Sequence, residues 1–94
     1  MSRIILREEA LASIVENALL KIEGVRGLSL RSPVRFEYSN AEIFIEVRIQ
    51  AFFNVDLVKV GREVIEKIKL EVESITPFKV KDIKVIFEDV VYES

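Results

Sequence analysis

The sequence contains no cysteine and no histidine. Without cysteine the chain can form neither a disulfide nor a thiolate nucleophile, and without both residue types it lacks the most common zinc ligands. Imidazole acid–base catalysis is excluded for the same reason. We therefore predict no catalytic residues, no metal site and no cofactor, and we expect the protein not to be an enzyme.

Long apolar runs and a strong charge excess are also missing. The opening segment MSRIILREEALA has three consecutive apolar residues before charges return, too few for a signal peptide. No run approaches the roughly 18 apolar residues of a membrane span. The chain has 14 Lys and Arg against 16 Asp and Glu, a balance that argues against DNA binding. We expect one cytoplasmic domain over residues 1–94, and a partner protein as one way of placing it at a membrane.

The clearest pattern is the alternation in AEIFIEVRIQAFF, residues 41–53. Successive side chains of a strand point to opposite faces, so this segment predicts a strand with one buried face. The predicted buried set is Ile43, Ile45, Val47, Ile49 and Ala51. The predicted opposite set is Glu42, Phe44, Glu46, Arg48 and Gln50. A second alternating segment, VRFEY at 34–38, predicts a hairpin partner joined through a tight turn at Ser39–Asn40.

Two segments have apolar residues at helical spacing. The first predicted helix covers about residues 8–23 and ends at Gly24, and the second covers about 55–75 with Asn54 as its N-cap. The predicted buried stripes are Leu11, Ile14, Val15, Ala18 and Ile22 in the first helix, and Leu57, Val64, Ile65, Ile68, Val72 and Ile75 in the second. Gly61 lies within the second stripe. We attribute the presence of a glycine there to close packing of the helix backbone on the sheet or the first helix.

Residues 25–33 are predicted to be a connection, and residues 79–90 the last strand. The element order α-β-β-α-β predicts an α+β two-layer sandwich, with a three-stranded sheet and both helices on one face. Residues 3–6 are a candidate for a short extra N-terminal strand. The same order occurs in cytoplasmic domains of cation-diffusion transporters and other ferredoxin-like modules, whose metal-binding versions usually use His or Cys.

The segment LREEALASIVENALLKIEGVRG, residues 6–27, resembles the opening of alkaline shock protein family domains. The positions that carry the resemblance are Glu23, Gly24, Val25 and Gly27 after the first helix, Asn54 and Asp56 before the second, and Ile83, Val85, Phe87, Glu88 and Val90 in the last strand. Arg7 departs from the family's usual capping residue. The resemblance implies a non-enzymatic role in the bacterial envelope stress response, through association with partners near the membrane, often a separate membrane anchor protein.

The sheet face away from the helices is the predicted functional surface. Charges dominate it, but apolar side chains interrupt them, and clustered exposed apolar side chains mark binding surfaces. The predicted partner-binding residues are Phe44, Phe52 and Ile86, with Arg48 fixing the orientation of the partner. The predicted partner is another protein or a second copy of the chain, with a homo-oligomer expected.

Two alternatives concern the same face. Exposed Phe and Arg on a sheet can stack and bind single-stranded RNA, although no RNA-recognition signature is present. The carboxylates could bind a hard cation or form an acid–base pair. These carboxylates are Glu37, Glu42, Glu46 and Glu88, and the cations available to neutralise them are Arg35, Arg48 and Lys84. We favour cross-strand ion pairs over a carboxylate site.

Overall fold

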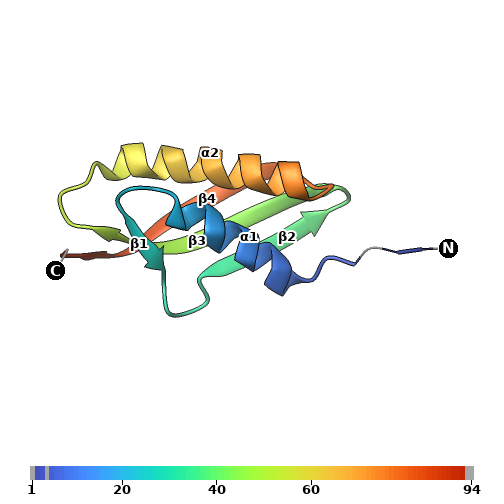
Figure 1. Ribbon diagram of the computed structural model, residues 1–94, viewed down its shortest axis with the longest axis horizontal. Helices are drawn as coiled ribbons and strands as arrows, with labels where there is room; N and C mark the ends of the chain where they lie inside the picture. The colour runs from blue at the N-terminus through green and yellow to red at the C-terminus, as the bar shows by residue number, and fades with distance from the viewer. Residues whose placement is uncertain (1, 4, 93–94) are drawn as a thin grey trace.

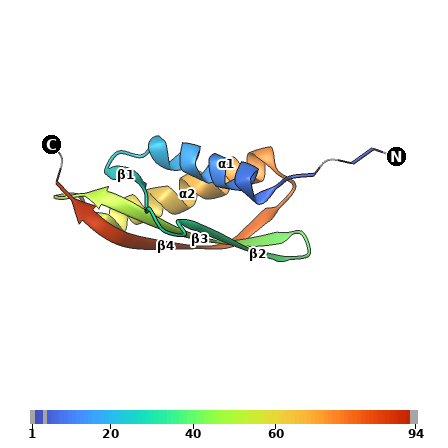
Figure 2. The same ribbon diagram turned by 90° about the horizontal axis from the view of Figure 1, so that it is seen from below.

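The computed structural model describes residues 2–3 and 5–92, and it consists of two layers. The elements are α1 (Glu8–Leu20), β1 (Val25–Leu28), β2 (Val34–Ser39), β3 (Glu42–Phe52), α2 (Leu57–Ile75) and β4 (Lys79–Val91). Both helices lie on one face of a single mixed sheet (Figures 1 and 2). The predicted α+β two-layer sandwich is confirmed. Among the described residues, no helix is long and apolar enough to cross a membrane.

The long strand β3 is the centre of the sheet. Along one side it pairs with β4 in parallel, for example Ile45 with Ile83. Along the other side it pairs antiparallel with β2 over its first half and with β1 over its second half, as in Phe36 with Ile45 and Leu28 with Ile49. The chain passes from β3 through α2 to β4, which is the crossover that a parallel pair requires.

The fourth strand lies elsewhere than expected. Arg3, Ile5 and Leu6 are in no strand, and residue 4 lies outside the described residues. The extra strand is instead β1, within the segment predicted to be a connection. A bulge between Val25 and Gly27 shifts the pairing of β1 with β3 by one residue. This four-residue strand therefore has no regular alternation for sequence analysis to detect.

The predicted helix ends need two corrections. Helix α1 ends at Leu20 rather than residue 23, and Gly24 closes the following turn at φ +97°. The N-cap of α2 is Asp56 rather than Asn54, because the Asp56 side chain accepts a hydrogen bond from the Lys59 N–H at 3.2 Å. Asn54 adopts φ +69°, a left-handed conformation that Asn tolerates, so it forms the turn before the helix.

The core lies between the helices and β3. The buried residues of α2 are Val60, Val64, Ile68 and Val72, spaced four apart. This corrects the predicted stripe, since Val60 was not included, and Ile65 and Ile75 are 37% and 60% exposed. The buried residues of α1 are Leu11, Val15, Ala18 and Leu19, where Leu19 was not predicted. In β3, every residue of the predicted buried set is 2% exposed or less.

Candidate interaction surface

The open face is the side of the sheet that carries no helix (Figure 2). Residues paired across strands share a face, so the register identifies its members. Arg35 and Glu37 of β2 pair with Glu46 and Phe44 of β3. The members from β3 and β4 are Phe44, Glu46, Arg48 and Phe52, opposite Asp82, Lys84, Ile86 and Val91. All four predicted partner-binding residues, Phe44, Arg48, Phe52 and Ile86, therefore lie on the open face.

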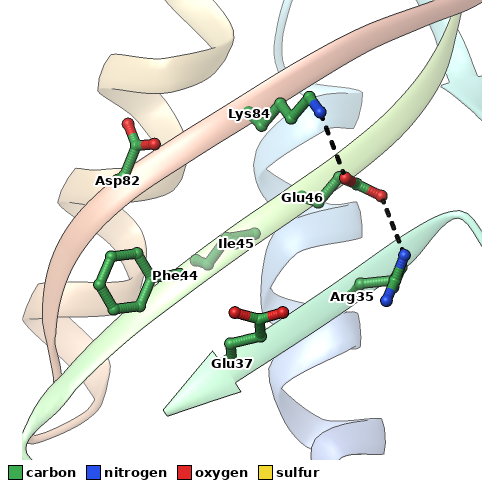
Figure 3. A pocket seen from close by; sticks show the side chains of 7 residues that line it. All are labelled: Arg35, Glu37, Phe44, Ile45, Glu46, Asp82 and Lys84. Carbon is green, nitrogen blue, oxygen red and sulfur yellow. Dashed lines mark ion pairs between the residues drawn. The ribbon is translucent and has the colours of Figure 1, made fainter. Parts of the chain in front are cut away.

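Phe44 lies in a shallow hollow of about 200 Å³ on this face (Figure 3). Its side chain is 36% exposed. The residues around it are Arg35, Glu37, Ile45, Glu46, Asp82 and Lys84, which come from three adjacent strands. Phe44 is thus an exposed aromatic ring framed by charged side chains.

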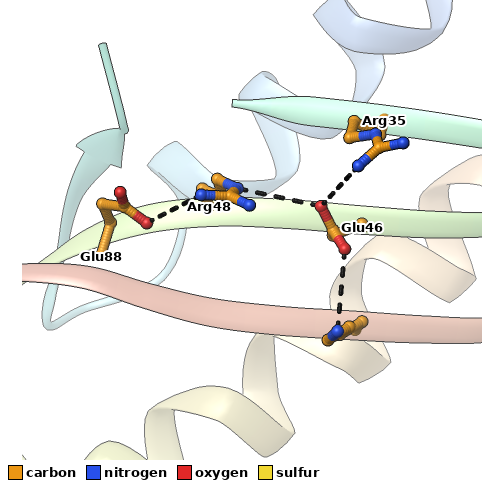
Figure 4. Close-up of polar contacts among 5 residues, drawn as sticks. Arg35, Glu46, Arg48 and Glu88 are labelled. Atoms are coloured by element: carbon orange, nitrogen blue, oxygen red, sulfur yellow. Dashed lines mark hydrogen bonds and ion pairs between the residues drawn. The ribbon is translucent and has the colours of Figure 1, made fainter. Parts of the chain in front are cut away.

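Glu46 is the centre of the charge network beside this hollow (Figures 3 and 4). Its carboxylate lies 3.9 Å from Arg35 Nη1, 3.8 Å from Arg48 Nε and 3.9 Å from Lys84 Nζ. These distances exceed hydrogen-bonding range, so the contacts are electrostatic. Glu46 Oε2 and Arg48 Nε are both buried without a hydrogen-bond partner. The pairs with Arg35 and Lys84, whose side chains are 65% and 69% exposed, contribute about 0–1 kcal/mol each, so they orient side chains more than they stabilise the fold.

Arg48 is held on both sides along the open face. Besides Glu46, it contacts Glu88 through Nη1 at 3.3 Å (Figure 4). Glu88 is the extra residue of a bulge, because Ile49 pairs with Phe87 and Gln50 with Asp89. The bulge places Glu88 within reach of Arg48, so Arg48 is already engaged within the chain. If Arg48 orients a partner, as predicted, it does so while it contacts Glu46 and Glu88.

The three predicted apolar residues do not form one patch. Phe44, Arg48 and Phe52 are four residues apart along β3, which corresponds to about 13 Å between successive positions. Ile86 pairs with Arg48, and Val91 with Phe52. Charged or polar rows at Glu46 and Gln50 separate these positions. The open face thus presents three apolar sites between polar rows rather than one continuous apolar surface.

Phe53, the residue after Phe52, forms an aromatic pair with Tyr92 at the end of the sheet. The rings of Phe53 and Tyr92 are 4.5 Å apart between centroids, with an interplanar angle of 33°. They are 48% and 76% exposed. The Phe53 N–H donates to the Val91 carbonyl at 2.7 Å, which holds the two strand ends together.

Two of the described residues have shifted pKa values, and both lie away from the open face. Burial, and then the negative charge of Glu8, raise the pKa of Tyr38, whose ring contacts Phe78 on the helix side. The hydrogen bond from Lys21, which joins α1 to α2 at 2.7 Å, lowers the pKa of Glu71. In the described part of the chain, no group of three or more carboxylates is placed to hold a metal ion.

A second surface was missed by sequence analysis. It is a groove between α2 and β4, and its apolar lining is Leu57, Val58, Gly61, Ile65, Val85 and Phe87. Arg62 is the charged member of the lining. Val58 and Ile65 are 65% and 37% exposed. Sequence analysis had assigned Ile65 to the buried stripe, so this groove could not be anticipated from the periodicity of α2.

Comparison with known proteins identifies the fold but no family. Neither a protein-family model nor a curated protein matches the sequence. Solved structures of the MamM C-terminal domain do match, one variant with 19% identity over 88% of this chain and 98% of that chain, at a TM-score of 0.61. A manganese form has 17% identity over 93% and 100% of the two chains, and a cadmium form 18% over 94% and 100%, both at a TM-score of 0.60. At this identity the likeness establishes a shared fold, and the resemblance to the alkaline shock protein family stays a prediction.

Proposed function

We propose that this chain is a non-enzymatic protein-interaction domain that binds a protein partner through the open face. The observation that carries the proposal is Phe44, an aromatic ring 36% exposed in a hollow framed by charged side chains of three strands. Exposing such a ring to water is unfavourable, and a partner side chain that covered it would bury apolar area at about 25 cal/mol per Å².

The charge network favours a protein over RNA as the partner. Arg35, Arg48 and Lys84 all lie within 4 Å of the Glu46 carboxylate. A phosphate approaching these cations would also approach that carboxylate, which repels it. A protein surface of mixed charge can satisfy both signs, and such complementarity fixes the orientation of a partner more than it adds affinity.

The finer proposal concerns where the partner lies. The resemblance of residues 6–27 to alkaline shock protein domains supports a partner at the bacterial envelope, including a membrane-anchored protein. Two of the structural neighbours are manganese and cadmium forms of MamM. We do not extend metal binding to this chain, because its described residues include no group of three or more His, Cys, Asp or Glu placed to hold a metal ion.

The test compares three baits in pull-downs from membrane and soluble fractions of the source cell. Phe44→Glu places a charge at the centre of the hollow, and we expect it to lower partner capture at least tenfold. Leu30→Glu is the matched control, because Leu30 is 93% exposed and does not line the hollow. Leu30→Glu should capture the partner as wild type does.

Equal capture by wild type and Phe44→Glu would refute the open face as the binding surface. Capture from the membrane fraction would support the envelope proposal.

A further inference from the structure

The outer edge of β4 has no partner strand. The strand runs from Lys79 to Val91, and among the described residues it pairs with β3 alone. Near its two ends, side chains bind backbone N–H groups, with Glu73 accepting from Val80 at 2.8 Å and Asp89 accepting from Val90 at 3.0 Å. A long edge strand with free N–H and C=O groups is a template for pairing with another strand. Among the described strands at the edges of the sheet, β4 with 13 residues is the longest, against 4 in β1 and 6 in β2.

The apolar groove between α2 and β4 runs beside this edge. Val58 and Ile65 of α2 form its exposed wall, and Val85 and Phe87 of β4 form its other side. A strand added to β4 would bring its own covering helix next to this wall. Edge pairing would then bury the groove in the same step that satisfies the backbone groups.

We propose that two copies of this chain pair through β4, antiparallel and centred on Ile86, to form one continuous sheet. In this register Ile86 faces Ile86 of the second copy, Val85 faces Phe87, and Lys84 faces Glu88. A two-fold interface is self-complementary, so each of the last two pairs occurs twice. Lys84 already contacts Glu46, and Glu88 contacts Arg48. Their side chains are 69% and 42% exposed, which leaves both able to make a second ion pair across the interface.

Registers shifted towards Lys84 are disfavoured by like charges, and a register centred on Phe87 would lose both Lys84–Glu88 pairs. Centring the pair on Val85 would place Asp82 opposite Glu88, and centring it on Lys84 would place two lysines opposite each other. Like charges directly opposite in antiparallel strands are destabilising. The groove includes Val85 and Phe87, the residues on either side of Ile86 in β4. The two Lys84–Glu88 pairs thus favour the Ile86 register, and the groove lies beside the same part of β4.

This dimer goes beyond the proposed function and does not depend on it. Pairing in one sheet would leave the open faces of both copies on the same side, with two Phe44 hollows available at once. Two hollows on one rigid sheet would bind a partner with repeated sites more tightly than one hollow can.

Single-cysteine variants test the register directly, because the natural chain has no cysteine. Directly opposed residues of an antiparallel pair have Cα atoms about 4.5–5.5 Å apart, within the range of a disulfide. Ile86→Cys should therefore form a disulfide-linked dimer under mild oxidation. In Lys84→Cys the two cysteines would lie about 13 Å apart, four residues along the strand, so we expect crosslinking at least tenfold slower.

Helix α2 provides a test that leaves both the strand and the open face unchanged. We expect sedimentation to show a wild-type dimer. Val58→Glu combined with Ile65→Glu should raise the dimer Kd at least tenfold. Leu70→Glu is the matched control, since Leu70 is 64% exposed on the same helix but does not line the groove. It should dimerise as wild type does, and so should Phe44→Glu, which separates this proposal from the open-face proposal.

Two results would overturn the dimer. A wild-type chain that stays monomeric across the concentration range would mean that the bulges and lysines of β4 protect the edge. Equal crosslinking of the two cysteine variants would mean that the copies associate in another register or through another surface. Circular dichroism of each variant establishes that it is folded before either result is interpreted.

Discussion

The two faces of β3 are built from alternate residues of one strand and meet different surroundings. On the helix side, Ile43, Val47 and Ile49 are fully buried in the core. On the open side, Glu46 and Arg48 form ion pairs at 3.3–3.9 Å with residues of both neighbouring strands. The helix-side face therefore consists of packed apolar side chains, and the open face of paired charged side chains.

This difference separates stability from recognition. Burial of the helix-side residues supplies the main free energy of folding, because the hydrophobic effect scales with apolar area removed from water. Ion pairs on a partly exposed face contribute little to that free energy. The open face can therefore change its charges and its apolar sites without unfolding the domain, which is the freedom that a binding surface needs.

The largest expected effect compares one residue from each face. Ile49→Ala removes a fully buried side chain and leaves a cavity, so we expect the free energy of unfolding to fall by about 2–5 kcal/mol. Phe44→Ala, on the open face, should cost about 1 kcal/mol or less. Urea unfolding measures both values. Similar losses for the two variants would mean that Phe44 is a core residue and would remove the distinction between the faces.

The next effect concerns the helix that covers the sheet. A Cβ added at Gly61 would lie 3.6 Å from Phe87 Cε2, an ordinary contact, so the packing is close but leaves room for a methyl group. Gly61→Ala should therefore raise the free energy of unfolding by about 0.5–1 kcal/mol, since alanine favours the helix.

Gly24→Ala provides the opposite case within the same chain. Gly24 has φ +97°, and its added Cβ would lie 3.0 Å from Val60 Cγ2. Urea unfolding should show this variant to be less stable than wild type. If Gly61→Ala were also destabilised, the contact of α2 with Phe87 would be tighter than the structure describes.

The regular elements followed from sequence, and the irregular ones did not. The alternation of residues 41–53 predicted both faces of β3, because period-2 patterns correspond directly to burial. The strand β1 was missed because its bulge and its four residues break that period. Asn54 was mistaken for the helix cap because Asn suits both a cap and a left-handed turn, and only the chain path decides between them.

Sequence analysis predicted which residues lie on the candidate site but not how they are placed relative to one another. Phe44, Arg48, Phe52 and Ile86 lie on the open face, as alternation indicated. The position of Ile86 beside Arg48 depends on the parallel register of β4, which no local pattern contains. The groove beside β4 depends on how α2 is rotated on the sheet, and the apolar periodicity of α2 alone placed Ile65 on the buried side.

The smallest expected effect compares ion pairs between the two layers. In the helix layer, Lys21 donates a hydrogen bond to Glu71 at 2.7 Å, shorter than any contact of Glu46 on the open face. This hydrogen bond is the main reason that the pKa of Glu71 lies below its usual value near 4.5. A lowered carboxyl pKa contributes stability that is present above about pH 4.5 and is lost as the pH falls through the folded-state pKa. Unfolding followed from pH 6 to pH 3 should therefore show a loss of stability that Glu71→Gln and Lys21→Met both reduce. An unchanged pH profile in Lys21→Met would mean that the link between α1 and α2 is no stronger than the ion pairs of the open face.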